Sequence, residues 1–371
     1  MADFGKDWQG VLTASRSGTP LEMTLLQTLR PLGWMHGVWQ SARAAGYERG
    51  LFPIWTPPVP TIAVGNLTAG GTGKTPTALW LLESLLAQGR RPALVSRGYR
   101  PGHQATLTVV SDGIHAPLSY PHAGDEAVLV ARRLPHCVVV TGPNRRDAVE
   151  WAVHTLGADS VVLDDAFQHL RVGRHLNLAL LDARRPLGNG RLLPAGYLRE
   201  RPSALARADL FLLTRADAPS HEQRARAWLE QSFPGRPVLA CRHRPRGWRS
   251  QDGTSLAVEA LAGQPLVAFA GLAQPEQFFH MVAQCGGKLV ARFPLPDHVS
   301  PDPALWQIME SAVRQHHAVG VVCTEKDRVK LPAAVPCCPL WSLEMTLQFQ
   351  DGSGVLDTAL QRILSPSAPA G

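Results

Sequence analysis

The stretch TIAVGNLTAGGTGKTPTALWLLESLLAQ, residues 61–88, decides the fold. It begins with a β-branched run over Thr61–Gly65, passes through a glycine-rich turn and ends in a helix-forming segment over Pro76–Gln88. A strand, a glycine-rich loop and a helix in that order form a phosphate-binding loop. We therefore predict an α/β fold of the P-loop NTPase type, with this strand parallel to its neighbours.

The loop itself predicts a site for a nucleoside triphosphate and Mg²⁺. Its glycines let backbone N–H groups curl around phosphate oxygens, and the next helix adds the partial positive charge of its N-terminus. Lys74 would reach the outer phosphates, and the Thr75 hydroxyl would bind Mg²⁺. Thr68 stands where the general pattern has its first glycine. The predicted nucleotide-binding residues are Thr68, Ala69, Gly70, Gly71, Thr72, Gly73, Lys74 and Thr75.

A second strand, expected over Val161–Asp164, ends in the paired carboxylates of Asp164 and Asp165. Adjacent carboxylates repel each other unless a cation or a donor lies between them, so this pair favours a metal role over a solvated turn. Gln168 and His169 follow on the same loop. They would orient Asp165, contact a substrate or make structural hydrogen bonds, and the sequence leaves these alternatives open.

Two further carboxylates, Asp125 and Glu126, follow Gly124 and precede the helical stretch Ala127–Arg133. Taken alone, they are typical of an acidic first turn on a helix. Only their combination with the other motifs gives them a functional interpretation.

Short β-branched runs alternate with helical stretches along the chain, which predicts parallel strands joined by crossovers. The Pro-, Arg- and Gly-rich stretch Arg242–Arg249 is interpreted as a connection between two series of strands. The predicted organisation is an N-terminal segment (1–52), a phosphate-loop domain (53–240) and a smaller C-terminal α/β lobe (241–371). Besides the two strands above, strands are expected at 93–96, 138–141, 178–182, 210–214, 238–241, 266–270, 289–293 and 319–324.

Residues 21–45 predict an amphipathic helix, because apolar side chains recur three or four positions apart. Pro31 and Gly33 are expected to kink or split it. The helix either docks on its own domain or lies in a membrane interface, where Trp and Arg are favoured. The apolar positions are Leu25, Leu29, Leu32, Met35, Trp39 and Ala42.

Charge and cysteine usage restrict the setting of the protein. The formal charge is +7, yet residues 167–250 alone hold 16 Arg, no Lys and 6 acids. No aromatic-interleaved motif accompanies this charge, so nucleic-acid binding is disfavoured. The six cysteines lack CxxC spacing, which fits a reducing compartment. No secretory signal and no segment able to span a bilayer are expected.

Taken together, the motifs resemble those of the tetraacyldisaccharide 4'-kinases, the lipid A 4'-kinases of Gram-negative bacteria. Thr68 is the usual residue of that family at its position. The resemblance extends from about residue 20 to about residue 331. It rests on VGNLTAGGTGKTP (64–76), SRGY (96–99), GDE (124–126), DDAFQH (164–169), GNG and LPAG (188–196), AGL (270–272), PEQFF (275–279), PDH (296–298) and TEKD (324–327).

The resemblance implies an ATP- and Mg²⁺-dependent lipid kinase. It would transfer the γ-phosphate of ATP to the 4'-hydroxyl of a tetraacyldisaccharide 1-phosphate and form lipid IVA in lipid A biosynthesis. It also implies a two-lobed α/β/α architecture with an N-terminal amphipathic helix. The protein would be peripheral on the cytoplasmic face of the inner membrane, and no obligate protein partner or nucleic acid is implied.

By the same resemblance, Asp125 and His298 form an acid–base pair that activates the sugar hydroxyl, while Glu126, Asp164 and Asp165 serve Mg²⁺–ATP. These roles fit the chemistry, because a sugar hydroxyl is a poor nucleophile at neutral pH and kinases place a carboxylate to accept its proton.

The lipid substrate carries a phosphate of its own, which gives the Arg-rich stretch a candidate role; a solvated basic face is the alternative. A phosphate-loop switch or partitioning ATPase is the main rival function. It would share the loop and Asp164, but it has less use for the GDE and PDH motifs. The candidate substrate-binding residues are Arg97, Gln168, His169, Arg171 and Asn189.

Overall fold

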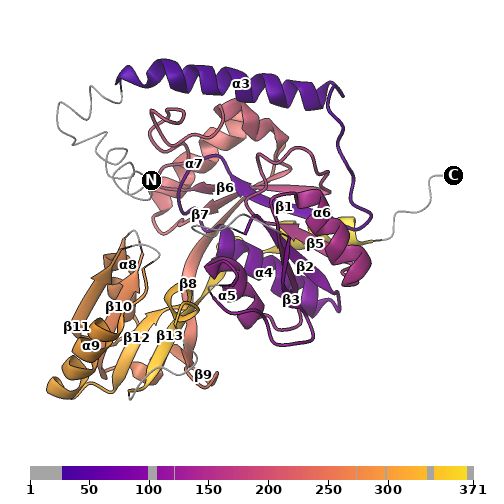
Figure 1. The fold of residues 1–371 in the computed structure, drawn as a ribbon. Helices are drawn as coiled ribbons and strands as arrows, with labels where there is room; N and C mark the ends of the chain where they lie inside the picture. The colour runs from indigo at the N-terminus through magenta and orange to yellow at the C-terminus, as the bar shows by residue number, and fades with distance from the viewer. Residues whose placement is uncertain are drawn as a thin grey trace. The chain divides into compact units, whose positions relative to one another are not determined.

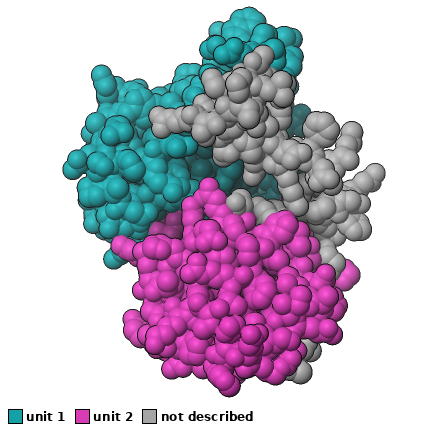
Figure 2. Space-filling view, turned by 90° about the vertical axis from the view of Figure 1, so that its left-hand side faces the viewer, with its two compact units in different colours: residues 1–97, 144–242, 348–371 teal, residues 98–143, 243–347 magenta. Residues whose placement is uncertain are grey.

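The computed structural model describes residues 27–98, 107–120, 122–272, 274–296, 299–331 and 338–365. They form the predicted α/β fold, with helices packed on largely parallel strands (Figure 1). The chain divides into two compact units, coloured separately in Figure 2. Unit 1 holds residues 1–97, 144–242 and 348–371, and unit 2 holds residues 98–143 and 243–347.

This division differs in three places from the organisation proposed from the sequence, the first being that residues 1–52 group with unit 1 and do not form a part of their own. Segment 98–143 groups with unit 2, where Arg133 pairs with Glu325 at 2.9 Å. The C-terminal segment from 348 groups with unit 1, where Phe349 packs on Trp80 with ring centroids 4.9 Å apart. Contacts between segments distant in sequence decide to which unit segments 98–143 and 348–371 belong. The order of elements along the chain does not reveal these contacts.

Unit 1 contains a parallel sheet in the order β8-β7-β6-β1-β5-β2. All its strands therefore end at the same edge, which is where ligands bind in open α/β sheets. The predicted strands of this unit are confirmed to within a few residues, except that β8 continues nine residues beyond its predicted end at Cys241. The strands are β1 (Thr61–Asn66), β2 (Pro92–Ser96), β5 (Ser160–Leu163), β6 (Leu176–Asp182), β7 (Leu210–Thr214) and β8 (Val238–Ser250).

The helices of unit 1 bury apolar faces against this sheet. On β6 and β7, alternate residues such as Leu181 and Leu213 point to one face, where Leu229 of α7 packs on them. Helix α4 begins at the loop and contacts β1, β2 and β5. The helices are α3 (Arg30–Glu48), α4 (Lys74–Ala87), α6 (Arg145–Glu150) with a π-helical turn (Trp151–Thr155), a 3₁₀ turn (Pro202–Arg207), α7 (Pro219–Ser232) and α11 (Gly354–Leu364).

Helix α3 runs over 19 residues from Arg30, and a turn at Leu29 separates it from the helical residues 27 and 28. The predicted helix is therefore interrupted beside Pro31, as expected, but it is not split at Gly33. Pro31 lies in the first turn, where its missing N–H removes no helical hydrogen bond. Gly33 and Gly37 are buried because they let the helix lie directly on residue Leu192; a Cβ on Gly33 would lie 3.1 Å from the Leu192 carbonyl oxygen. The opposite side of the helix exposes Leu32, Trp34, Met35, Val38 and Trp39.

Unit 2 has parallel strands in the order β11-β10-β12-β13 and an antiparallel pair, β3 with β4. Alternate residues of β10 enter two cores, Ala268 with Phe279 on one face and Phe269 with Trp306 on the other. The elements are β3 (Thr108–Asp112), α5 (Asp125–Arg133), β4 (Val138–Thr141), β9 (Ser255–Leu256), a 3₁₀ turn (Val258–Leu261), β10 (Pro265–Gly271), α8 (Pro275–Gln284), β11 (Lys288–Leu295), α9 (Pro303–Gln315), β12 (Gly320–Thr324), α10 (Glu325–Arg328) and β13 (Leu340–Phe349).

The stretch Arg242–Arg249 carries the chain from unit 1, which ends here at Arg242, into unit 2, which resumes at His243, so the connection lies where it was predicted. Its conformation was predicted wrongly, because the stretch is part of the long strand β8 and not a turn or loop. Trp248 of this stretch is fully buried, and its indole N–H donates to the Val258 carbonyl at 3.0 Å. The end of β8 pairs with β9 in antiparallel fashion. Burial of Trp248 and this pairing outweigh the polar, breaker-rich composition of the segment.

Candidate functional site

The phosphate-binding loop lies between Asn66, the last residue of β1, and Lys74, the first of α4. Gly70 and Gly73 have φ of 110° and 82°, which side-chain-bearing residues rarely adopt. Gly73 is the N-cap of α4, so the free N–H groups of the first helical turn face the loop. Ala69 is held in place because its N–H donates to the Tyr197 carbonyl at 2.7 Å.

Asn66 connects the loop to the residues around it. Its side-chain carbonyl accepts from Lys74 Nζ at 3.3 Å, and its amide donates to the Thr68 carbonyl at 2.6 Å. Gln168 donates to its backbone carbonyl at 2.9 Å. Thr68 does not adopt the positive φ that would require a glycine, and it is buried beside the Asn66 side-chain amide. Asn66 was not predicted as a site residue, although its place at the end of β1, directly before the glycine-rich loop, was a usable signal.

Asp165 is paired with two cations at the carboxyl edge of the sheet. Lys74 Nζ lies 3.5 Å from its Oδ1, and Arg199 Nη1 donates to its two oxygens at 2.8 and 3.0 Å. Burial raises the pKa of this carboxyl, but Lys74 and Arg199 outweigh burial and hold its pKa below the usual value. Asp165 is therefore a carboxylate at neutral pH.

The backbone at Asp165 is itself unusual, with a φ of 49°. Its N–H donates to Asp164 Oδ1 at 2.9 Å, which fixes the two carboxylates relative to each other. Strained backbone of this kind is concentrated at functional sites. Asp164 is almost fully buried, and Arg145 beside it donates to the Asp164 carbonyl at 3.4 Å. Burial lowers the pKa of Arg145 to about 10, so it remains a cation.

The loop has the features that a bound nucleotide would need. Thr72 Oγ1 is buried and has no hydrogen-bond partner among the described residues, so a ligand oxygen could satisfy it. The described parts of the chain contain no group of three or more His, Cys, Asp or Glu that could hold a metal.

The loop after Asp165 is held from two directions. Arg174 donates to the carbonyls of Ala166 and His169 at 3.1 and 2.7 Å. From helix α3, Arg43 donates to the Gln168 carbonyl at 3.2 Å. Helix α3 therefore contacts the segment that carries the predicted site residues.

The lowered pKa of His169 should make the stability of the folded protein depend on pH. Burial, followed by the charges of the surrounding arginines, lowers its pKa to about 4. Between pH 6.5 and 4 the unfolded chain then binds a proton at this position that the folded chain excludes, so stability falls as the pH falls. We expect urea unfolding free energies to drop by about 1 kcal/mol from pH 7.5 to 5 because of this group, since part of the ring remains exposed. The variant His169→Gln should lack this component; an unchanged pH slope would contradict it.

The other candidate substrate residues differ in their surroundings. Arg97 is exposed just after β2. Arg171 is exposed, and its Nε donates to the Tyr47 hydroxyl of α3 at 3.3 Å. Asn189 has a structural role: its Oδ1 accepts from the backbone N–H groups of Arg191 and Tyr197 at 3.2 and 3.3 Å. The structure therefore links Gln168 to Asp165 through Arg199, which donates to both side chains, while Asn189 stabilises a turn.

In unit 2, Asp125 and Glu126 form the acidic first turn of α5. Lys326 Nζ lies 3.8 Å from Asp125 Oδ2, and both side chains are mostly buried. The sequence motif TEKD, which had no assigned role, thus places Lys326 beside the predicted base. His298 and its neighbour Asp297 lie outside the described residues.

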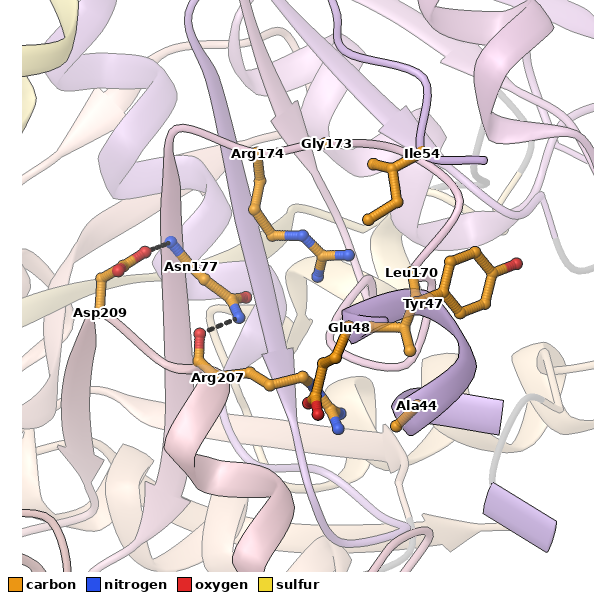
Figure 3. Close-up of a pocket in the computed structure, with 10 residues that line it drawn as sticks. All are labelled: Ala44, Tyr47, Glu48, Ile54, Leu170, Gly173, Arg174, Asn177, Arg207 and Asp209. Carbon is orange, nitrogen blue, oxygen red and sulfur yellow. Dashed lines mark hydrogen bonds between the residues drawn. The ribbon is translucent and has the colours of Figure 1, made fainter. Parts of the chain in front are cut away.

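A separate pocket of about 370 Å³ lies at the opposite, amino-terminal edge of the unit 1 sheet. It is lined by Tyr47 of α3 and by Asn177 and Arg207, among others. Figure 3 shows Asn177 bonded to both Asp209 and Arg207, at 2.8 Å each. Because it lies at the other end of these strands from the glycine-rich loop, the pocket is distinct from the nucleotide site.

Comparisons with known proteins agree with the geometry. The family model of tetraacyldisaccharide-1-P 4'-kinase (LpxK) matches residues 25–365. The tetraacyldisaccharide 4'-kinase of Syntrophotalea carbinolica is 41% identical over 94% of both chains. That of Pelobacter propionicus is 37% identical over 98% of this chain and 95% of its own. The crystal structure of LpxK from Aquifex aeolicus in complex with ATP is 28% identical, with a TM-score of 0.76, over 92% of this chain and 99% of that one. The chain therefore belongs to the tetraacyldisaccharide 4'-kinase family, as its motifs predicted.

Proposed function

We propose that the protein transfers the γ-phosphate of ATP to the 4'-hydroxyl of a tetraacyldisaccharide 1-phosphate and so forms lipid IVA in lipid A biosynthesis. The observation that carries the proposal is the glycine-rich loop with Lys74 beside the Asp165 carboxylate, in a chain of this family. The family likeness over nearly the whole chain disfavours a phosphate-loop switch, the rival function.

In this proposal, the loop N–H groups and Lys74 hold the β- and γ-phosphates and balance the charge that spreads over the transferred group. Thr75 and a carboxylate of the Asp164 and Asp165 pair hold Mg²⁺, with Glu126 as a further candidate ligand. When bound, Mg²⁺ would supply positive charge that offsets part of the negative charge of the phosphates. Arg199 keeps Asp165 oriented, because its guanidinium binds both carboxylate oxygens.

Proton removal from the sugar hydroxyl is assigned to Asp125 and His298. A carboxylate within hydrogen-bond reach of the hydroxyl lowers the barrier as the bond to phosphorus forms. Lys326 supports this role of Asp125, since its Nζ lies 3.8 Å from Oδ2 and helps to hold the carboxylate in place.

The lipid headgroup is proposed to contact Arg97, Gln168, His169 and Arg171, whose donors suit phosphate and sugar oxygens. Asn189 stays a candidate through its Nδ2, which is buried and without a hydrogen-bond partner among the described residues.

The decisive experiment is transfer of label from [γ-³²P]ATP to a tetraacyldisaccharide 1-phosphate in mixed micelles, followed by chromatography of the lipid. Label on the disaccharide is expected. Wild-type protein that hydrolyses ATP without labelling lipid would favour the switch function, and protein inactive in both assays would contradict the ATP-dependent proposal.

We also propose that helix α3 lies in the membrane interface. Its outer face exposes Trp34, Met35 and Trp39 by about 60% each, an apolar surface that water solvates poorly. No helix in the described part of the chain is long and apolar enough to cross a bilayer. An interfacial helix would hold the protein peripherally on the cytoplasmic face of the inner membrane, where its lipid substrate lies.

The triple variant Trp34→Ser, Met35→Ser and Trp39→Ser is expected to lose most of its flotation with anionic liposomes, because the apolar area that enters the interface is removed. The KM for the lipid should rise several-fold while the KM for ATP stays unchanged. As a control, Ile114→Ser and Val355→Ser remove exposed apolar side chains elsewhere. Equal flotation of the triple variant and the wild type would contradict the interfacial role.

A further inference from the structure

The end of strand β7 contacts the phosphate-binding loop at two consecutive residues. Thr214 Oγ1 donates to the Thr72 carbonyl at 3.0 Å. The next residue, Arg215, borders Gly71: a Cβ built on that glycine would lie 3.8 Å from Arg215 Nη2. Strand β7 therefore forms one wall of the loop, and Arg215 is the charged group on that wall.

Arg215 is held in an unusual conformation. Its φ of 53° lies in the left-handed region, which a residue with a long side chain rarely adopts. Its Nη1 donates to Asp182 Oδ2 at 2.8 Å, at the end of the neighbouring strand β6. The guanidinium is thus anchored through one nitrogen, while about 30% of the side chain stays exposed. Backbone strain combined with an anchored, partly exposed side chain is typical of a binding position.

The direction of the bound nucleotide follows from the sheet order. The γ-phosphate end is marked by Lys74 and Asp165, and Asp165 follows β5, on one side of β1. Strands β6 and β7 lie on the other side of β1. With the phosphates in the loop and the γ-phosphate toward β5, a nucleoside on the other side of the loop would lie near the ends of β6 and β7, where Arg215 lies.

We propose that Arg215, anchored by Asp182, is a nucleotide-binding residue whose guanidinium plane packs on the base of ATP. A guanidinium stacks well on an aromatic ring because it is flat, delocalised and weakly hydrated. This inference deepens the proposed kinase function and rests on it. The strand end would then recognise the nucleoside, while the loop holds the phosphates.

The structure offers a matched control in Arg184. It binds the same carboxylate, with its Nη2 2.8 Å from Asp182 Oδ2, but it follows β6 in sequence and its side chain is 41% exposed. Arg184→Ala removes one of the two arginines that pair with Asp182, and it leaves Arg215 beside Gly71 of the loop unchanged. Any effect found only in Arg215 variants cannot come from the loss of an Asp182 ion pair alone.

The test is steady-state phosphorylation of the tetraacyldisaccharide 1-phosphate by the full chain at varied ATP. Arg215→Ala is expected to raise the KM for ATP about tenfold with kcat changed less than twofold, since the base lies away from the transferred phosphate. Arg215→Lys, which keeps the charge but lacks the plane, should still raise the KM about fivefold. Arg184→Ala should leave it within twofold of the wild type.

Three results would overturn the inference. An unchanged KM in Arg215→Ala would exclude contact with ATP. A kcat that falls as much as kcat/KM would show that Arg215 only shapes the loop. Full recovery by Arg215→Lys would replace stacking with a simple charge contact. Failure of the wild type to phosphorylate the lipid would instead count against the proposed function, so the two failures are distinguishable.

Discussion

Replacement of Lys74 by alanine is expected to lower kcat for lipid phosphorylation about a thousandfold, the largest single effect in unit 1. Lys74 Nζ lies between Asn66 Oδ1 and the Asp165 carboxylate, at 3.3 and 3.5 Å, so it is fixed before the phosphates arrive. A preorganised cation of this kind stabilises charge that develops in the transition state, and single donors in such positions contribute about 10²–10³ in rate. The measurement is the rate of label transfer from [γ-³²P]ATP at saturating substrates.

Two controls separate this effect from loss of structure. Lys288→Ala removes an exposed lysine at the start of β11 and is expected to leave kcat unchanged. Thermal unfolding of Lys74→Ala should stay close to that of the wild type, because Arg199 still pairs with Asp165. A Lys74→Ala enzyme with more than a tenth of the wild-type kcat would remove Lys74 from the transition-state role.

The sequence predicted the part of the site that depends on local pattern. Lys74 and Asp165 are both predictable, because Lys74 ends the glycine-rich loop that follows β1, and Asp165 comes two residues after the apolar strand β5. Their meeting at 3.5 Å follows from the parallel pairing of β1 with β5, since parallel strands end at one edge.

Residues brought in from elsewhere were harder to predict. Arg199 and Arg145 reach Asp165 and Asp164 from 34 and 19 residues away in the sequence, and the chain holds many other arginines of similar local context. Only the tertiary fold selects these two. Charge density along the sequence indicated an anionic ligand without indicating which arginines are committed to internal carboxylates.

The errors in the fold have the same physical origin. The stretch Arg242–Arg249 contains Pro245 and Gly247, residues that are depleted in strands. It is nevertheless extended, because Arg249 pairs with Glu344 of β13 and Trp248 enters a core with Phe278. Contacts at such sequence separation override local propensity, and a single sequence does not record them.

Replacement of Asp125 by asparagine is expected to lower kcat by about 10²–10⁴ while ATP binding is retained, because general-base catalysis contributes this much and the amide cannot accept the proton. The side chain lies in the first turn of α5, with Lys326 Nζ 3.8 Å from Oδ2. Asparagine preserves the shape of the side chain, so the change removes charge and basicity without opening a cavity. Label transfer to the lipid and calorimetric titration with ATP measure the two properties separately.

Loss of a negative charge from the first turn of a helix also costs about 0.3–1 kcal/mol through the helix dipole, and this must be separated from catalysis. Asp357→Asn is the matched control for the helix-dipole effect, since Asp357 lies in the first turn of α11 and has no assigned role in the reaction. Both variants should lose a similar, small amount of stability, whereas only Asp125→Asn should lose activity. If Asp125→Asn kept full kcat, Asp125 would not be the base. If ATP affinity fell in step with kcat, Asp125 would act on the nucleotide, and His298 would be the remaining candidate for proton removal.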